Sequence, residues 1–452
     1  MKKIIIRLLY SLFFSFAAVL IISCTLLVLN TSKSKEEIYN NIDAVVISGG
    51  EEASNDAYMR LEAIDLGGSE HYKEIVTHDG YDSLDTDEKQ YLYEKIQDNI
   101  YTITNETDEN GHYRTARLQV TGVKMSEFDI REVVNAFVYD NPQVFWFENL
   151  FGYAYSGDDT IVEFYSVLSS EECGEYIERF QKKVDEITAS VDKGLSEYER
   201  EKRLHDILLQ NCAYKSGVTS SSDGWTYFSA YGAIVDGEAV CEGYAKSMQI
   251  LLNLVGIPCS TIRGTGDNVG HMWNVVRLGG EWYHLDATWN DNDDGTISYE
   301  YFNVTTERIE MNHVINEDIR SLLTRNGDSD GAAIKYNFCV PDCTSVKMNY
   351  YTVEGYRLES FNDESDQGMI NAIVKHIKND NLILPVSFGR QMTYTEYVNS
   401  LFHEPPFKFY YYVDNANEVL DDEHKISKES VTIQKNEENM SLHIHFKLVE
   451  ND

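Results

Sequence analysis

Three short segments decide the fold of this chain: AVCEGY at residues 239–244, GHMWN at residues 270–274 and WYHLDATW at residues 282–289. They contain, in this order, a cysteine, a histidine and an aspartate. A thiol nucleophile needs a base that keeps it ionised, and the base needs a carboxylate that fixes its tautomer. The three segments therefore form a candidate site for attack on an amide bond.

The cysteine of the first segment, Cys241, opens a predicted helix that ends at the cap Gly256. A cysteine in a first turn lies where the helix dipole and unpaired N–H groups stabilise a thiolate. We therefore expect Cys241 to be a nucleophile instead of an inert buried thiol. Its backbone N–H is one candidate donor to an oxyanion. Trp225, Tyr227 and Tyr231 stay open as sources of a second donor.

The histidine and the aspartate fall on a predicted hairpin. Residues 271–286 are expected to form two antiparallel strands around a two-residue Gly-Gly turn. On this register Trp273 faces Asp286, and His271 is the diagonal neighbour of Asp286 on the same face, about 7–8 Å away at the backbone. The hairpin thus brings a candidate base and its carboxylate together. His284 shares the face and is interpreted as a histidine of the wall.

The composition excludes several classes of protein. The 452 residues include 38 Lys and Arg against 75 Asp and Glu, which gives a formal net charge of −37. Such a field repels nucleic-acid phosphates, so we expect no nucleic-acid partner. The seven cysteines are too few and too scattered for a disulfide framework. No ligand group at zinc spacing accompanies the two closest cysteines, and we expect no metal and no cofactor.

The N-terminus differs from the rest of the chain. A basic flank at residues 2–7 precedes an uncharged run from Leu8 to Leu29, which is long enough to span a bilayer as a helix. We expect residues 1–30 to be a single membrane anchor, with the body of the protein outside the cytoplasmic membrane. Two alternatives stay open: lipidation at Cys24, in the lipobox-like sequence IISC, or cleavage as a signal peptide followed by secretion.

The remaining sequence divides into four predicted parts. Residues 31–80 are polar and acidic and are expected to form a stalk. Residues 81–168 are expected to form a small α+β domain, and residues 169–325 the core that carries the three segments. Residues 330–452 are expected to form a C-terminal α/β domain of unknown role, since no group of residues in it suggests chemistry.

Local patterns predict individual elements. Ser196 with Glu199 forms a capping-box signature at the start of a helix that precedes the core. In the C-terminal domain, residues 350–353 and 407–413 are rich in aromatic and β-branched side chains and are expected to be strands. Residues 366–378 repeat at a helical period and are expected to be a helix.

Several segments together resemble the bacterial branch of the transglutaminase-like superfamily. They are AYGAIVDGEAVCEGYA at 230–245, GIPC at 256–259, the two segments GHMWN and WYHLDATW, and the helix HDILLQNCAY at 205–214. The resemblance covers about residues 196–305. It implies a papain-like α+β core, in which a cysteine-bearing helix packs on an antiparallel sheet, flanked in this chain by smaller α/β domains.

By this resemblance, Cys241 would be the nucleophile, His271 the base and Asp286 the orienting carboxylate. It implies attack on a protein or peptide amide through a thioester, which water or an amine then resolves. A cell-wall peptide is a further candidate substrate. The superfamily contains acyltransferases, proteases, amidases and inactive relatives. The main hypothesis is therefore a cysteine enzyme of the cell surface, and the alternative is a catalytically silent binding module on the same scaffold.

Overall fold

The computed structural model describes residues 45–52, 77–107, 111–115, 117–316, 319–320, 333–437 and 439–449. The predicted anchor at residues 1–30 and most of the predicted stalk lie outside these ranges. Among the described helices, none has the length and apolar character needed to cross a bilayer. All six cysteines in the described residues are free thiols.

The chain divides into two compact units. The first comprises the described residues up to Ile297 together with those between Glu307 and Asp342, and the second comprises Ser298–Thr306 and the described residues from Cys343 onward. The first unit contains the three segments that opened the sequence analysis, so the position of the candidate site depends on its elements.

The first unit begins with a sheet covered by helices. In the sheet, strands follow the order β1-β5-β6-β3-β2, with β4 also paired to β6, and β1 runs parallel to β5. The elements are β1 (Val45–Glu52), α3 (Asp79–Asp82), α4 (Asp87–Asn99), β2 (Ile103–Thr107), β3 (Tyr113–Thr115), β4 (Leu118–Val120), α5 (Glu127–Asp140), β5 (Phe147–Ser156) and β6 (Asp159–Ser166). Tyr93 of α4 packs edge-on against Phe137 of α5, which in turn contacts Phe147 of β5. These buried rings join the helices to the sheet.

Two long helices lead to the core, α6 (Ser170–Ala189) and α7 (Glu197–Asn211). The predicted capping box at the start of α7 is confirmed: Ser196 Oγ accepts the backbone N–H of Glu199, and the Glu199 carboxylate accepts the N–H of Ser196. Leu204 and Leu208, one turn apart, are buried. The cap and the apolar face therefore fix where α7 begins and which side faces the protein.

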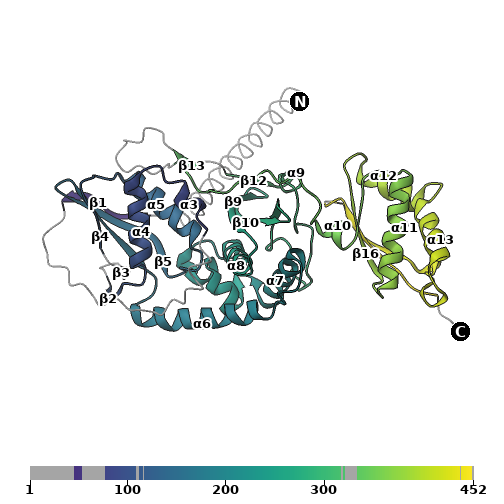
Figure 1. Ribbon diagram of the computed structural model, residues 1–452, viewed down its shortest axis with the longest axis horizontal. Coiled ribbons are helices and arrows are strands. Elements are labelled where there is room, and N and C mark those ends of the chain that lie inside the picture. Colours follow the sequence, from purple (N-terminus) through teal and green to yellow (C-terminus); the bar gives the residue numbers. More distant parts are fainter. Residues whose placement is uncertain are drawn as a thin grey trace, which may run out of the picture. The chain divides into compact units, whose positions relative to one another are not determined.

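The core packs α8 (Cys241–Leu254) on an antiparallel sheet of order β11-β10-β9-β12 (Figure 1). The strands are β9 (Cys259–Gly266), β10 (Val269–Leu278), β11 (Glu281–Leu285) and β12 (His313–Ile315). Asn274 of β10 ties the two layers together, because its side-chain amide donates to the carbonyl of Ala245 at 2.9 Å. The helix that carries the cysteine is thereby held against the strand that carries the histidine.

The predicted hairpin register is confirmed. Leu278 pairs with Glu281, and Val275 pairs with His284, across a turn made of only two residues. Gly279 and Gly280, which form that turn, have φ values of 55° and 84°. Two successive positive φ values are the requirement of a type I′ turn, which glycine meets without strain.

Short elements connect these layers. They are β7 (Ala213–Tyr214), η1 (Ser221–Asp223), η2 (Trp225–Phe228), the π-helical η3 (Gly232–Asp236), β8 (Glu238–Ala239), α9 (Thr306–Ile309), β13 (Ile319–Arg320) and β14 (Ala333–Ile334). Strands β7 and β8 pair in parallel. This pairing places Tyr214 next to the segment that enters α8.

The second unit is built around a sheet of order β15-β16-β18-β17. Its elements are α10 (Tyr350–Val353), β15 (Tyr356–Leu358), α11 (Asp363–Lys378), β16 (Ile383–Phe388), α12 (Tyr394–Val398), η4 (Asn399–His403), α13 (Lys408–Val419), η5 (Asp422–His424), η6 (Lys428–Ser430), β17 (Thr432–Asn436) and β18 (Ser441–His445). The predicted helix at residues 366–378 is confirmed within α11.

Two predicted strands of this unit are wrong. Residues 350–353 form the short helix α10, which Asn349 caps through its side chain. Residues 407–413 mostly belong to the helix α13, whose buried residues Phe409, Val413 and Ala416 recur at a helical spacing. The aromatic run has a high strand propensity, but packing of α13 on α11 buries one helical face and decides the conformation.

Candidate active site

The histidine and the aspartate of the predicted site form a hydrogen-bonded pair. Nε2 of His271 lies 2.6 Å from Oδ2 of Asp286. His271 extends from β10, and Asp286 directly follows β11, as the hairpin register requires. The backbone N–H of Trp289 donates to the other carboxylate oxygen, Oδ1, at 3.1 Å. Asp286 is fully buried, so its charge acts on these few partners.

The cysteine also interacts with the His271 ring. Burial lowers the pKa of His271, but the Asp286 carboxylate and the Cys241 thiol, which both hydrogen-bond to the ring, raise it to about 10. Burial raises the pKa of Asp286, yet His271 and His313 outweigh burial and hold that pKa well below its usual range. The arrangement favours a protonated imidazole next to an ionised carboxylate. Such an imidazole can stabilise a thiolate and later donate a proton.

The start of α8 leaves its first N–H groups without a side-chain cap. The residue before the helix is Val240, which cannot accept a hydrogen bond through its side chain. By contrast, Ser126, Ser169 and Ser196 cap the helices α5, α6 and α7. The first N–H groups of a helix have no intrahelical acceptor. The uncapped N–H of Cys241 therefore suits an anion formed next to the thiol.

Gly243 lets another segment approach this helix start closely. A Cβ atom at this position would lie 2.7 Å from the Cβ of Ala239 and 2.8 Å from the carbonyl oxygen of Ser229. Neither distance is compatible with a side chain. The glycine two residues after the cysteine is thus explained by packing of the 227–229 segment across the first turn.

The candidate second oxyanion donors differ in their surroundings. Tyr231 is buried in an aromatic cluster and lies 4.8 Å from Tyr176, measured between ring centroids. Trp225 stacks on Phe145 in the same cluster at 6.0 Å. Tyr227 instead accepts the backbone N–H of Val240, the residue before α8, through its carbonyl. Of the three, Tyr227 is bonded to the entrance of the helix, while the other two rings pack into the cluster.

His284 has the environment of a structural, neutral histidine. Its Nδ1 atom accepts the indole N–H of Trp273 at 3.1 Å, which requires that nitrogen to be unprotonated. Burial and the nearby His313 lower the pKa of His284 to about 3. The interpretation of His284 as a histidine of the wall fits both observations.

A second histidine at the site, His313, was not identified from the sequence. It lies on β12, and its Nε2 atom is 3.0 Å from Oδ2 of Asp286, the same oxygen that His271 contacts. Strand β12 has only three residues, which is too short for a periodic signal. It pairs with β9, far away in the chain. A local pattern therefore could not have found it.

Three side chains of this group have the chemistry of metal ligands. One ligand atom each from His271, Asp286 and His313 lies within 4.8 Å of the others, the one such cluster in the described residues. Both histidine nitrogens, however, point at a single carboxylate oxygen and are joined to it by hydrogen bonds. A shared ion would have to break both bonds. The donor geometry is that of a hydrogen-bonded network and does not fit a metal centre.

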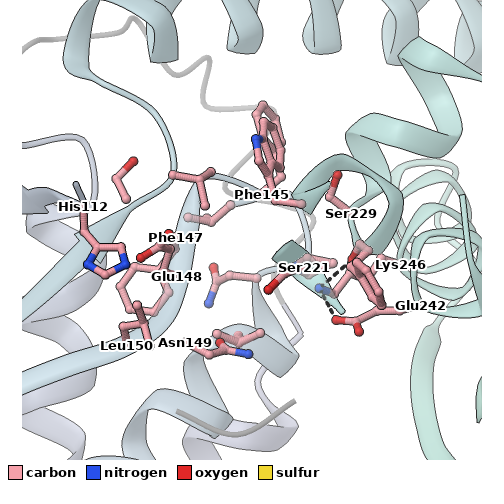
Figure 2. A pocket seen from close by; sticks show the side chains of 18 of the residues that line it. His112, Phe145, Phe147, Glu148, Asn149, Leu150, Ser221, Ser229, Glu242 and Lys246 are labelled. Atoms are coloured by element: carbon pink, nitrogen blue, oxygen red, sulfur yellow. Dashed lines mark hydrogen bonds and ion pairs between the residues drawn. The ribbon is translucent and has the colours of Figure 1, made fainter. Parts of the chain in front are cut away.

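A cavity of about 460 Å³ lies beside the first turn of α8 (Figure 2). Figure 2 shows His112 and Glu148 across the cavity from Glu242 and Lys246 of α8, with Phe145 also on its wall. Glu242 follows the cysteine directly in sequence and forms an ion pair of 2.6 Å with Lys246. The cavity thus combines aromatic and charged side chains next to the element that carries the thiol.

Comparison with known families identifies this region. The model of the transglutaminase-like superfamily matches residues 182–287, which include Cys241, His271 and Asp286. Residues 182–287 form a transglutaminase-like domain. The α+β core predicted from the sequence is the core of this superfamily, and its members are usually cysteine enzymes.

Individual relatives match different shares of the chain. The kyphoscoliosis peptidase of Homo sapiens is 30% identical over 73 residues, which cover 14% of this chain. The chain spans only 11% of that curated relative. A solved TGase structure is 13% identical and covers 39% of this chain and 52% of its own, with a TM-score of 0.24. The periplasmic domain of TgpA from Pseudomonas aeruginosa is 17% identical and covers 29% of this chain and 54% of its own, with a TM-score of 0.19.

Proposed function

We propose that this transglutaminase-like protein is a cysteine enzyme that attacks protein or peptide amide bonds through a thioester. Cys241 is the nucleophile, His271 the acid and base, and Asp286 the orienting carboxylate. One observation carries the proposal: the His271 ring hydrogen-bonds to the Asp286 carboxylate through Nε2 and to the Cys241 thiol as well. A nucleophile, a base and a carboxylate joined in this order are the parts of a catalytic triad.

The reaction follows from these positions. The Cys241 thiolate attacks the amide carbon, and the carbonyl oxygen becomes an oxyanion near the uncapped N–H of Cys241. Protonated His271 gives its proton to the departing amine as the carbon–nitrogen bond breaks, which leaves a thioester. His271 then takes a proton from water or from an amine, which attacks the thioester carbon. The thiolate leaves, and the product is an acid or a new amide.

The substrate and location belong to the same proposal. The substrate is a segment of a protein or peptide, and a cell-wall peptide is a second candidate; this part rests on the triad, because Cys241, His271 and Asp286 do not line the cavity beside α8. The apolar run from Leu8 to Leu29 favours an anchor in the cell membrane with the body outside the cytoplasm. Lipidation at Cys24 and secretion are the alternatives.

Alkylation by iodoacetamide tests the nucleophile in the full chain. The alkylation of Cys241 is measured by peptide mass spectrometry near neutral pH. We expect Cys241 to react at least about tenfold faster than free cysteine, because the thiolate reacts and the thiol does not. His271→Ala should remove most of this advantage. The proposal fails if Cys241 reacts no faster than free cysteine and the variant does not change its rate. That result would favour the alternative, a silent binding module.

A glutamine peptide distinguishes hydrolysis from transfer. The peptide is incubated with the full chain with and without a primary amine, and ammonia release and amine incorporation are both measured. Ammonia release without incorporation identifies a hydrolase under these conditions, whereas incorporation identifies an acyltransferase. Cys241→Ala is the control, because any product that this variant still forms does not come from the thiol.

A further inference from the structure

Asp286 is contacted by two histidines through one oxygen atom. Nε2 of His271 lies 2.6 Å from Oδ2, and Nε2 of His313 lies 3.0 Å from the same atom. Oδ1 accepts the backbone N–H of Trp289. A triad requires only the first of these contacts, so the contact with His313 calls for a separate explanation.

The ring of His313 is held on several sides. The residue is 1% exposed. Its Nδ1 atom lies 2.8 Å from the side-chain oxygen of Asn312. The ring centroid is 4.3 Å from that of Trp289 and 5.0 Å from that of Trp273. Because the ring is fixed in this way, its Nε2 atom stays directed at the Asp286 carboxylate, and no further rotamer entropy is lost when a substrate binds.

The backbone of β12 gives His313 its position. His313 pairs with Gly266 of β9, and the same strand β9 pairs on its other edge with β10, which carries His271. Strand β9 therefore lies between the two strands that supply the histidines. A glycine at position 266 leaves the space that the Trp289 ring occupies, since a Cβ there would lie 2.8 Å from that ring.

We propose that His313 is a positioning residue of the active site, which holds the Asp286 carboxylate so that Oδ2 faces His271. The N–H of His313 and the N–H of Trp289 bind the two carboxylate oxygens and prevent rotation of the carboxylate. The inference rests on the proposed function, because it assigns a role within that triad. It differs from a packing role, in which only the shape of the His313 ring would matter.

Two substitutions separate these roles. His313→Gln keeps a side-chain N–H donor, whereas His313→Phe keeps a ring of similar shape and removes the donor. The probe is p-nitrophenyl acetate, an activated ester that a thiolate can attack without a specific substrate pocket. We expect His313→Phe to slow release of p-nitrophenolate roughly 100-fold, the cost of a small misplacement of a catalytic group. His313→Gln should retain a rate within about tenfold of the original.

The pH profile is a second readout. Asp286 interacts with His271, His313 and Tyr214, and these groups interact in turn with Cys241 and His284. Since the hydrogen bond from His313 helps to keep Asp286 ionised, its loss should move the acid limb of the rate to higher pH in His313→Phe. In His313→Gln the acid limb of the rate should stay near the pH at which it lies in the parent chain. A merely structural role would lower the rate without this difference.

A spectroscopic measurement separates failure of this inference from failure of the proposed function. The proton between His271 and Asp286 should give a low-field ¹H NMR signal, which we expect to shift or disappear in His313→Phe even if no ester is cleaved. If His313→Phe retains the original rate, pH profile and NMR signal, the positioning role is wrong. If the parent chain cleaves no ester but the signal still depends on His313, the contact is real and the proposed reaction is wrong.

A milder variant guards against loss of folding. Asn312→Ala removes the side-chain partner of the other ring nitrogen and leaves His313 in place. Its rate should lie between those of the parent chain and His313→Phe. His205→Phe serves as the matched control, because His205 is equally buried and bonds to Asn290 instead of Asp286. If its acid limb moves as in His313→Phe, the effect is not specific to Asp286 and the inference fails.

Discussion

Nε2 of His271 and Oδ2 of Asp286 lie 2.6 Å apart, and the carboxylate is shielded completely from solvent. Because the pair is buried, its attraction is screened far less than that of a surface ion pair. Burial alone would lower the pKa of His271, so the value of about 10 is due to the charged and hydrogen-bonding partners that outweigh it. This balance makes the protonation of His271 sensitive to a single charge.

Asp286→Asn should therefore change the alkaline limb of ester cleavage. The negative charge favours protonated His271, so its removal lowers the pKa of His271 and leaves only the Cys241 thiol to oppose burial. Protonated His271 is then lost at a lower pH than in the parent chain. The alkaline limb of the rate, expected near pH 10 in the parent chain, should therefore move to lower pH. The rate of p-nitrophenolate release from pH 5 to 11 measures this.

Asp267→Asn is the matched control for that shift. Asp267 is exposed in the turn between β9 and β10 and has a positive φ of 48°, which asparagine tolerates. The Asp267→Asn substitution removes the same formal charge as Asp286→Asn. The pH profile of this variant should coincide with that of the parent chain. If Asp286→Asn keeps the original alkaline limb, the assignment of that limb to His271 is wrong.

Gly266→Ala should disturb the site through packing. The added Cβ would lie 2.8 Å from the ring of Trp289 and 3.3 Å from that of His271. We expect a loss of about 1–3 kcal/mol in the free energy of unfolding, typical of overpacking, together with slower ester cleavage. Gly194→Ala, in an exposed turn, should affect neither. An unchanged rate in Gly266→Ala would mean that the Trp289 ring can move without displacing His271.

Asn337→Ala should destabilise the first unit by about 2–3 kcal/mol, because it leaves a buried backbone donor without its acceptor. Asn337 is 2% exposed, accepts the N–H of Arg263 at 2.7 Å and donates to its carbonyl at 2.9 Å. The Asn337 side chain thus makes the two hydrogen bonds to the backbone of β9 that a paired strand would make. Urea unfolding followed by tryptophan fluorescence reports this unit, because all five tryptophans lie before residue 298. Asn292→Ala, at an exposed position, should change the unfolding free energy by less than about 0.5 kcal/mol.

Ser196→Ala should lower the free energy of unfolding by about 1 kcal/mol, which is the usual effect of removing a helix N-cap. The hydroxyl accepts the N–H of Glu199 at 3.3 Å, and the Glu199 carboxylate accepts the N–H of Ser196 at 2.8 Å. The same urea titration measures the change. Ser216→Ala, an exposed serine outside any helix, should have no measurable effect. A comparable loss in both variants would contradict the capping role.

The sequence predicted those parts of the site that depend on local geometry. The Gly-Gly turn determines the register of β10 and β11, and this register alone brings His271 and Asp286 together. The capping signature of Ser196 likewise marks the start of α7, because cap and first turn are adjacent in sequence. In these cases a few neighbouring residues decide the structure.

The features that the sequence did not predict depend on distant packing. His313 reaches Asp286 only because β12 pairs with β9, and nothing within its three residues indicates that pairing. The run at residues 407–413 fits a strand by composition, but burial of Phe409 and Val413 against other elements makes it helical. In both cases the partner that decides the structure lies elsewhere in the chain.

The order of elements in the core has a consequence for how this protein can diverge. Cys241, His271 and Asp286 come from α8, β10 and the end of β11 without any part of the second unit between them, whereas Ser298–Thr306 of that unit precedes His313 of β12. Sequence added before residue 241 or after residue 313 lengthens no loop that joins these four side chains, so it adds no closure entropy to their assembly. The sequence before residue 241 can therefore change without altering the connections between the four side chains, whereas an exchange of the second unit must keep the connection through Ser298–Thr306.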